Sequence, residues 1–511
     1  MAHSNKELSH ILEQLDLGSS IAELDKLLET ARVETSAFSD LLNDKVDLIP
    51  GTKGSGKSAL FRIFVDFLPK ILFKSRKVVI AHGVQKHGDS VFHAFKDQFE
   101  KFTEDQFIDF WCIYFVSLVH EQFLKGDIYS QPLKTADKEI GAFKRACAAA
   151  KIPDIEAKKS LSQVLEWIMT IIKSNSPKIT YKFPGNAGEI ELDLFGEPIE
   201  KGVEKETENG RYNLPAYMSS IKDALETLLK RLDLSIWLMV DRLDEIFPRR
   251  STLESTALRA LLKTMRLFTS ETIRIKIFLR DDMLENLLSV GEGFTALTHI
   301  TARQADTLRW TEDQILTMVV KRIFANEPIA RYLGIDKGRL DASLDYRREV
   351  FYKVFSATVH RGANQSPTLR WIYSHTADAR GVVTPRDVID LLTKAKQHQQ
   401  DIFSSDPSGS SEYIIGPASI QYGLDELSKR KRTTYLEAEF PHLWPDIKKF
   451  VGGRTEYSTA ALAITLGKKW EAIADDLVSI GLLSKSTRRG QSIYWFPYVY
   501  RAGLNLSRGH A

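Results

Sequence analysis

The sequence predicts an α/β protein in which helices flank a parallel β-sheet. Two observations lead to this fold class. Short apolar runs typical of buried strands alternate with segments of helical periodicity, and a glycine-rich loop joins the first run to a helix. This alternation favours parallel pairing, because each helix carries the chain back across the sheet. The apolar runs are residues 45–50, 78–81, 236–240, 273–279 and 307–310.

The chain has 511 residues, more than the roughly 250 to 300 at which a single core stops growing. Two or three domains are therefore expected. With 43% hydrophobic and 27% charged residues, the composition is that of an ordinary globular protein. The predicted division is a helical lead-in at 1–40, an α/β core at 41–325, a helical lid at 326–403, a linker at 404–411 and a C-terminal module at 412–511.

Residues from about 125 to 215 show a weaker pattern than their surroundings, and we interpret them as an insertion into the α/β core. An alanine-rich helix is expected at 142–151, because Pro153 should end it, and a more strongly amphipathic helix at 161–172. The period then changes from helical to alternating. Residues 179–183 and 189–194, separated by proline and glycine, predict a β-hairpin.

Targeting and cysteine signals favour a cytoplasmic protein. The most apolar stretch, residues 110–119, is well short of the roughly 18 residues that span a bilayer, so a buried helix is expected there. The N-terminus lacks the apolar core of a signal peptide. Cys112 and Cys147 lie in apolar helical segments without CxxC or Cys/His spacing, which favours core packing over disulfides or zinc.

The glycine-rich loop matches the pattern G-x-x-x-x-G-K-S/T between an expected strand and an expected helix. Glycines allow positive φ angles, so that successive N–H groups can surround phosphate oxygens. Lys57 is expected to bridge the β- and γ-phosphates, and the Ser58 hydroxyl to complete a magnesium shell. The expected nucleotide-binding residues are Gly51, Thr52, Lys53, Gly54, Ser55, Gly56, Lys57, Ser58 and Ala59.

A second motif supplies carboxylates. The apolar run 236–240 ends at Asp241, which we expect to hold magnesium, and Asp244 and Glu245 follow. A second carboxylate near the metal can orient a water for in-line attack on the γ-phosphate. Asp244 is favoured for this role and Glu245 is next. The alternative is that both residues cap the next segment and pair with Arg249 or Arg250.

Several arginines are candidates for contacts to phosphate. Arg280 ends the run 273–279 and can sense the γ-phosphate, although Asp281 and Asp282 can equally pair with it. Arg386 begins a helix of the predicted lid, from which a guanidinium can reach the phosphates, and the alternative is an ordinary surface arginine. An arginine finger from a neighbouring subunit would be Arg303, Arg309 or neither.

Together these motifs resemble the ASCE division of P-loop ATPases, in particular its AAA+ and STAND-like branch. Residues 51–58, 236–245, 273–280 and 385–386 follow the order of Walker A, Walker B, sensor 1 and sensor 2 in that group. The spacing of Asp241, Asp244 and Glu245 is similar to the hhhhD-x-h-D-E pattern of STAND and NACHT proteins, whereas Arg242 replaces the small residue usual there. The resemblance covers roughly residues 15–400, apart from the insertion, and implies ATP and Mg²⁺ as cofactors.

Two sequence segments also resemble a set of bacterial P-loop ATPases, some of them associated with phage defence. They are residues 18–25, GSSIAELD, and residues 51–60, GTKGSGKSAL. The resemblance implies ATP as the nucleotide, and no N/T-K-x-D motif for guanine follows the later strands. It also implies a homo-oligomer that acts with a separately encoded effector or partner protein.

The C-terminal module has the predicted order helix, helix, hairpin of a winged helix, at residues 458–466, 470–483, 483–487 and 493–496. From Lys429 onward the chain has 14 Lys and Arg residues but only 7 Asp and Glu, so this segment is positively charged. DNA is therefore a candidate partner of residues 429–511. Lys485, Arg488 and Arg489 on the wing favour phosphate contact. The acidic residues of the second helix, namely Glu471, Asp475 and Asp476, oppose it, and docking to protein is the alternative.

Three functional hypotheses follow from the sequence. The first is an ATP-driven molecular switch that regulates a partner, because no nuclease, protease, deaminase or TIR-like set of residues is present. The second is a DNA-binding ATPase that uses the winged helix. The third is a nucleotide-binding scaffold with little turnover.

Overall fold

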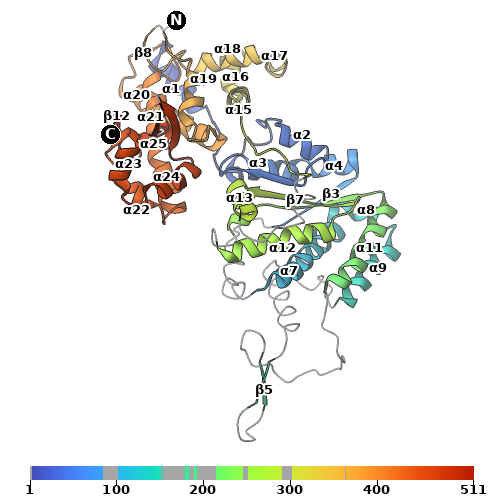
Figure 1. Ribbon diagram of the computed structural model, residues 1–511. Helices are drawn as coiled ribbons and strands as arrows, with labels where there is room; N and C mark the ends of the chain where they lie inside the picture. The colour runs from blue at the N-terminus through green and yellow to red at the C-terminus, as the bar shows by residue number, and fades with distance from the viewer. Residues whose placement is uncertain are drawn as a thin grey trace. The chain divides into compact units, whose positions relative to one another are not determined.

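The computed structural model describes two compact units (Figure 1). Unit 1 comprises Met1–Ser36, Lys53–Ala59 and Leu308–Ala511, and unit 2 comprises Ala37–Thr52 and Leu60–Thr307. The described residues are 3–83, 102–150, 152, 179–182, 189–192, 214–245, 251–289, 302–362, 364–488 and 490–511.

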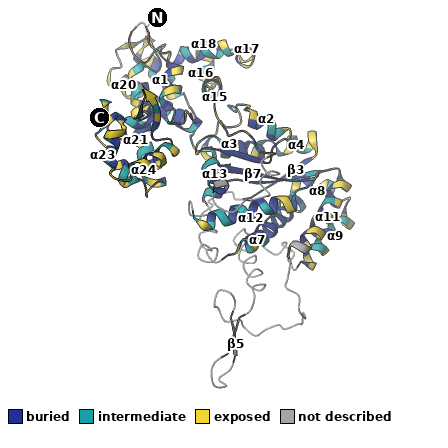
Figure 2. Ribbon diagram, in the orientation of Figure 1, coloured by how far each residue is buried: buried dark blue, intermediate teal, exposed yellow. Residues whose placement is uncertain are grey.

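Unit 2 is built on a four-stranded parallel sheet in the order β2-β7-β6-β3. Its strands are β2 (Leu48–Gly51), β7 (Ile273–Arg280), β6 (Ser235–Val240) and β3 (Val78–Gly83). Nearly all their residues are buried, as near-continuous apolar runs in parallel sheets require (Figure 2). Four of the five expected strands, and the predicted α/β class, are confirmed.

The prediction of a fifth strand at residues 307–310 is wrong. The edge of the sheet is instead extended by an isolated parallel bridge between Leu48 and Gln304. The carbonyl of Arg303 accepts hydrogen bonds from the N–H groups of Asp47 and Leu48, and Ala305 N–H donates to the Leu48 carbonyl. These bonds attach the chain to β2 a few residues earlier than the apolar pattern suggests.

Helices cover both faces of the sheet (Figure 1). On one face lie α2 (Ser36–Leu42), the helix that begins as α3 (Lys57–Arg62) and continues as the π-helix η2 (Ile63–Phe67), and α4 (Pro69–Arg76). The ring of Phe64 packs against Trp237 of β6 at 6.2 Å between centroids. The opposite face carries α7 (Glu104–Leu118), α11 (Leu214–Leu232), α12 (Thr252–Phe268) and α13 (Asp281–Ser289).

Helix α7 is the centre of the core on that second face. Every residue from Phe110 to Leu118 is buried, and the Trp111 indole N–H donates to the Ala257 carbonyl of α12 at 3.0 Å. With the following π-helix η3 (Val119–Leu124), it is the one helix in the described part of the chain that is long and apolar enough to cross a membrane, but 78% of its most apolar window is buried inside the protein. The expectation of a buried helix at 110–119 is confirmed.

The predicted insertion is described in part. Helix α9 (Asp137–Ala149) confirms the alanine-rich helix, and it packs against α11. Strands β4 (Ile179–Lys182) and β5 (Glu189–Leu192) pair antiparallel, which confirms the hairpin. The helix expected at 161–172 lies outside the described residues. Cys112 and Cys147 are buried free thiols, as core packing requires, and burial raises the pKa of the Cys112 thiol.

Unit 1 combines the first helix with the C-terminal half of the chain. Helix α1 (Asn5–Glu13) packs against α20 (Pro385–Ser405), which in turn packs against α21 (Pro417–Lys431). The expected linker at 404–411 holds the end of α20 and the short strand β8 (Ser410–Ser411), which pairs with β1 (His3–Ser4). The remaining helices of this part are α15 (Glu312–Phe324), α16 (Glu327–Tyr332), α17 (Lys337–Ala342), α18 (Leu344–Val354) and α19 (Thr368–Thr376).

The end of unit 1 has the expected order of two helices and a hairpin. Helices α23 (Thr459–Leu466) and α24 (Trp470–Ser479) precede strands β10 (Ser484–Arg488) and β11 (Gln491–Trp495). Two strands without a sequence signal, β9 (Arg454–Ser458) and β12 (Ser507–His510), complete a sheet in the order β10-β11-β9-β12. Between α21 and β9, the chain forms the π-helix η7 (Arg432–Glu437) and then α22 (Trp444–Ile447).

Candidate nucleotide-binding site

The glycine-rich loop runs from the end of β2, at Gly51, to the start of α3, at Lys57. Gly54 has φ of 82° and Gly56 has φ of 100°, both in the left-handed region where a side chain is strained. Gly51 does not need this freedom, because it is paired in the sheet opposite Arg280. Backbone turns of this kind direct successive N–H groups toward a common point and favour anion binding.

The middle of this loop contacts other residues of unit 1. The Trp310 indole N–H donates to the Ser55 carbonyl at 2.7 Å, and the Lys53 ammonium pairs with the Glu439 carboxylate. A Cβ atom at Gly54 would lie 3.2 Å from Cβ of Arg386. The Arg386 guanidinium donates to the Ser20 carbonyl at 3.4 Å. The arginine expected in the lid therefore lies against the loop.

The acidic strand end lies in unit 2. Asp241 directly follows β6 and is buried, with 3% of its surface exposed. Arg242 has φ of 61°, a left-handed conformation that costs most side chains roughly 1–2 kcal/mol. The next residues form the 3-10 turn η6 (Leu243–Glu245), whereas the Glu245 side chain and residues 246–250 lie outside the described part.

Arg280 contacts Asp244, another of the expected site residues. It ends β7, its side chain is 5% exposed, and its Nη1 lies 3.5 Å from Oδ2 of Asp244. It also makes a bidentate pair with Asp282, with donor–acceptor distances of 2.9 and 2.7 Å. The expected local pairing with an adjacent aspartate is therefore confirmed at Asp282, and the role of Arg280 as a sensor of the γ-phosphate stays a prediction.

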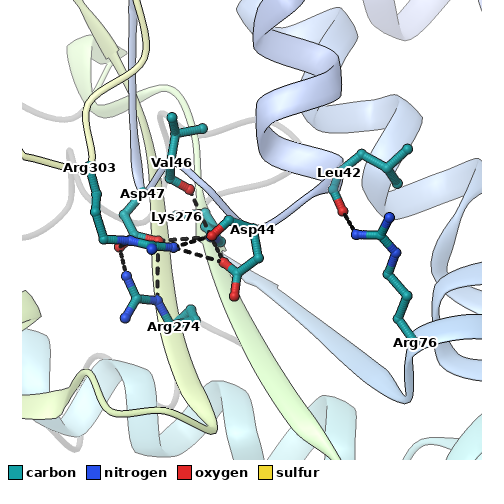
Figure 3. Close-up of polar contacts among 8 residues, drawn as sticks. All are labelled: Leu42, Asp44, Val46, Asp47, Arg76, Arg274, Lys276 and Arg303. Atoms are coloured by element: carbon teal, nitrogen blue, oxygen red, sulfur yellow. Dashed lines mark hydrogen bonds and ion pairs between the residues drawn. The ribbon is translucent and has the colours of Figure 1, made fainter.

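Arg303, one of the two arginine-finger candidates, lies at the opposite end of the sheet. Its guanidinium donates to the Asp47 carboxylate at 2.7 Å and also pairs with Asp44 (Figure 3). Asp47 immediately precedes β2, whereas the glycine-rich loop follows β2. The Arg303 guanidinium is thus paired within its own subunit, and its role as a finger stays a prediction. Arg309, the other candidate, is exposed.

Sequence reasoning missed several polar residues that the structure brings together. Trp310 and Glu439 carry no motif, and their contacts to the loop join distant parts of the sequence. A charge in the middle of an apolar strand was an available signal for Lys276, which is fully buried on β7. Such a charge requires a buried partner, because an unpaired buried ion is very costly.

The donor set fits a nucleotide-bound magnesium ion. Within the described ranges, no three or more His, Cys, Asp or Glu side chains gather into a group that could hold a metal. The expected ligands Ser58 and Asp241 offer oxygen atoms only, and Mg²⁺ prefers few protein oxygens completed by phosphate and water. With Gly54 and Gly56 in the left-handed region, the loop also fits an anion.

Comparison with known proteins gives remote likenesses only. No family model and no curated protein matches the chain. A Walker-type ATPase of Pyrococcus abyssi is 12% identical, with a TM-score of 0.39 over 96% of this chain and 100% of that one. The ORC2 protein of Aeropyrum pernix, in ADPNP–ADP complexes, is 10% identical, with a TM-score of 0.28 over 93% and 95%. Cdc6p of Pyrobaculum aerophilum is 13% identical, with a TM-score of 0.21 over 59% and 73%.

Proposed function

We propose that the chain binds Mg·ATP at residues 51–58 and hydrolyses it. The observation that carries the proposal is the strand–loop–helix order, with Gly54 and Gly56 in the left-handed region directly before Lys57 and Ser58. Few local structures other than an anion cradle need this combination of glycines, a lysine and a hydroxyl. The remote resemblance in motif order favours ATP as the nucleotide.

Each proposed residue has a distinct task. The loop amides hold phosphate oxygens, and the Lys57 ammonium neutralises charge on the β- and γ-phosphates. Ser58 and Asp241 are the proposed ligands of magnesium, which when bound supplies positive charge to the phosphate oxygens. Asp244, with Glu245 next, accepts a hydrogen bond from the attacking water and orients it. Arg280, within 3.5 Å of Asp244, fixes the direction of that carboxylate.

Binding and turnover are tested separately. Calorimetry should detect uptake of Mg·ATP by the folded wild-type chain, and phosphate release should follow in single-turnover assays. Asp244→Asn or Glu245→Gln should slow release at least tenfold while leaving binding in place, since each removes a carboxylate that acts on water. A chain that binds Mg·ATP but shows no loss of turnover in either variant would be the nucleotide-binding scaffold of the third hypothesis.

We propose further that ATP acts as a switch which regulates a separately encoded partner. Arg386 lies against Gly54 of the loop, so a change at the phosphates has a direct route to helix α20 of the lid. A homo-oligomer and a setting in bacterial anti-phage defence complete this proposal, and they rest on the resemblance of residues 18–25 and 51–60. The proposed cytoplasmic location rests on the targeting and cysteine signals of the sequence. Light scattering with and without Mg·ATP tests the oligomer. Co-purification with nucleotide tests the partner.

DNA is the second candidate partner, through a winged helix formed by the C-terminal strands and helices. The net positive charge after Lys429 favours it. Against it, Glu471, Asp475 and Asp476 are exposed on α24, and Arg488 pairs with Glu456 at 3.5 Å. Reversing the charges of Lys485, Arg488 and Arg489 should abolish salt-sensitive DNA retention if DNA is bound. Equal ATPase activity with and without DNA, and no retention by wild type, would exclude this role.

A further inference from the structure

We propose that Trp310 is a positioning residue of the phosphate-binding loop, an inference that rests on the proposed ATP site. The indole N–H of Trp310 donates to the Ser55 carbonyl at 2.7 Å, and the indole ring lies 3.7 Å from the Cβ position at Gly56. The side chain therefore contacts both residues of one peptide group at the centre of the loop. Sequence motifs assign no role to it.

Peptide geometry explains why this contact matters. The Ser55 carbonyl and the Gly56 N–H belong to the same planar trans peptide, so they point in opposite directions. A hydrogen bond that fixes the carbonyl on one side fixes the N–H on the other. A reversed peptide would present a carbonyl oxygen, instead of an N–H group, to a bound phosphate. The hydrogen bond from Trp310 thus keeps the Gly56 N–H group pointing toward a bound phosphate.

The loop has little internal means to resist such a reversal. Reversal of this peptide changes ψ of Ser55 and φ of Gly56, and glycine crosses between positive and negative φ more readily than any other residue. The freedom that lets the backbone approach phosphate closely also lets the peptide turn over. A strong external donor at Ser55 supplies the constraint that Gly56 removes.

Trp310 is itself held in place. Its carbonyl accepts a hydrogen bond from the Tyr373 hydroxyl of α19 at 2.9 Å. The next residue, Thr311, caps α15 and forms a reciprocal capping box with Gln314, which fixes the chain direction at this point. The backbone of Trp310 is therefore held from two sides, which fixes the point from which the indole reaches Ser55. A rigid donor loses little entropy when it orders the loop.

The neighbouring loop residues are held by other segments of unit 1. Lys53 pairs with Glu439, whose side chain is only 6% exposed, and Gly54 lies against Arg386 and Thr384. Lys53, Gly54 and Ser55 are thus each contacted by a different segment of unit 1. Among these contacts, only that of Trp310 acts on the orientation of a peptide group.

The test is Trp310→Phe, which removes the N–H donor and keeps an aromatic ring. Loss of one hydrogen bond should weaken Mg·ATP binding roughly three- to tenfold in calorimetry. Mg·tripolyphosphate should lose the same factor, since the effect is on phosphates and not on the base. Tyr373→Phe, which frees the Trp310 carbonyl, should give a smaller loss in the same direction. Trp470→Phe, on α24, is the matched control and should change neither affinity.

Fluorescence adds a signal that a purely structural role would not produce. Wild type and Trp470→Phe should show a change in tryptophan emission on addition of Mg·ATP, and Trp310→Phe should lose it. The inference would be overturned if folded Trp310→Phe bound both ligands with wild-type affinity. If Trp310→Phe does not fold, wild-type affinity of Tyr373→Phe for both ligands would overturn it instead. The proposed binding site is judged apart, because it fails if wild type does not bind Mg·ATP or if Lys57→Ala binds equally well.

Discussion

The two ends of the sheet in unit 2 carry different kinds of polar residues, although the same strands form both. At the amino ends, the carboxylate of Asp47 before β2 accepts from Lys276 at 2.8 Å and from Arg303 at 2.7 Å, and it also pairs with Arg274 (Figure 3). Lys276 is 0% exposed and Asp47 4%. We call Asp44, Asp47, Arg274, Lys276 and Arg303 the amino-end network.

The carboxyl ends carry the glycine-rich loop, whereas left-handed residues other than glycine lie at both ends, since Asp44, Lys77 and Asp233 precede β2, β3 and β6 and Arg242 follows β6. Gly51 pairs with Arg280 at the end of β2 and β7, and the chain then enters a loop that contains two left-handed glycines. After β6, Arg242 adopts a left-handed conformation that its side chain disfavours. We expect the amino-end network to serve stability and the carboxyl ends to serve the proposed nucleotide.

The largest effect is expected at the amino end, from Asp47→Asn. This change leaves Lys276 buried without its main countercharge, and breaking a buried ion pair costs about 3–5 kcal/mol. Chemical denaturation should show this loss in the free energy of unfolding. Asp44→Asn is the control, because its side chain is 40% exposed and the loss should stay below about 1 kcal/mol. A loss under about 1 kcal/mol for Asp47→Asn would show that the network is not structural.

Lys57→Ala at the carboxyl end should give the opposite pattern. Charge-assisted hydrogen bonds contribute about 1.5–3 kcal/mol, so Mg·ATP binding should weaken by roughly ten- to a hundredfold. The free energy of unfolding without nucleotide should change by less than in Asp47→Asn, because Lys57 is only half-buried. Lys45→Ala, whose side chain is 67% exposed before β2, should change neither quantity. Destabilisation equal to that of Asp47→Asn would erase the distinction between the two ends.

Acid should act on the amino end in a defined direction. Burial disfavours ionisation of Asp47, but Lys276, Arg303 and Arg274 outweigh it, so the pKa of Asp47 lies below its ordinary value of 3.8. The stabilisation it provides is therefore complete above pH 3.8 and is lost as the pH falls below that value. Denaturation curves of wild type and Asp47→Asn should converge as the pH is lowered in this range. A constant difference between them would contradict the lowered pKa.

The sequence allowed prediction of what depends on neighbouring residues. The strands at 45–50 and 273–279 follow from continuous apolar runs, and the positive φ of Gly54 and Gly56 follows from residue type. The contacts that hold the loop could not be predicted in this way. Trp310 and Ser55 are 255 positions apart, and Lys53 and Glu439 are 386 apart, so only the folded chain brings them together.

The edge of the sheet shows the same limit. Leu308 and Trp310 suggested a strand at 307–310, yet pairing with β2 occurs at Gln304, where the polar sequence gives no such signal. The deciding factor is the pair of backbone hydrogen bonds to the Arg303 carbonyl, together with the ion pairs of its side chain. Tertiary contacts thus set the register against the local apolar pattern.

The smallest expected effect concerns the backbone at the carboxyl end. Arg242→Gly should raise the free energy of unfolding by up to about 1 kcal/mol, because glycine adopts the observed left-handed conformation without steric cost, although it gains freedom in the unfolded chain. Thermal and chemical denaturation should agree on the sign. A decrease would show that the Arg242 side chain contributes more through its contacts than its conformation costs. The left-handed conformation of Arg242 would then carry no net cost in this turn.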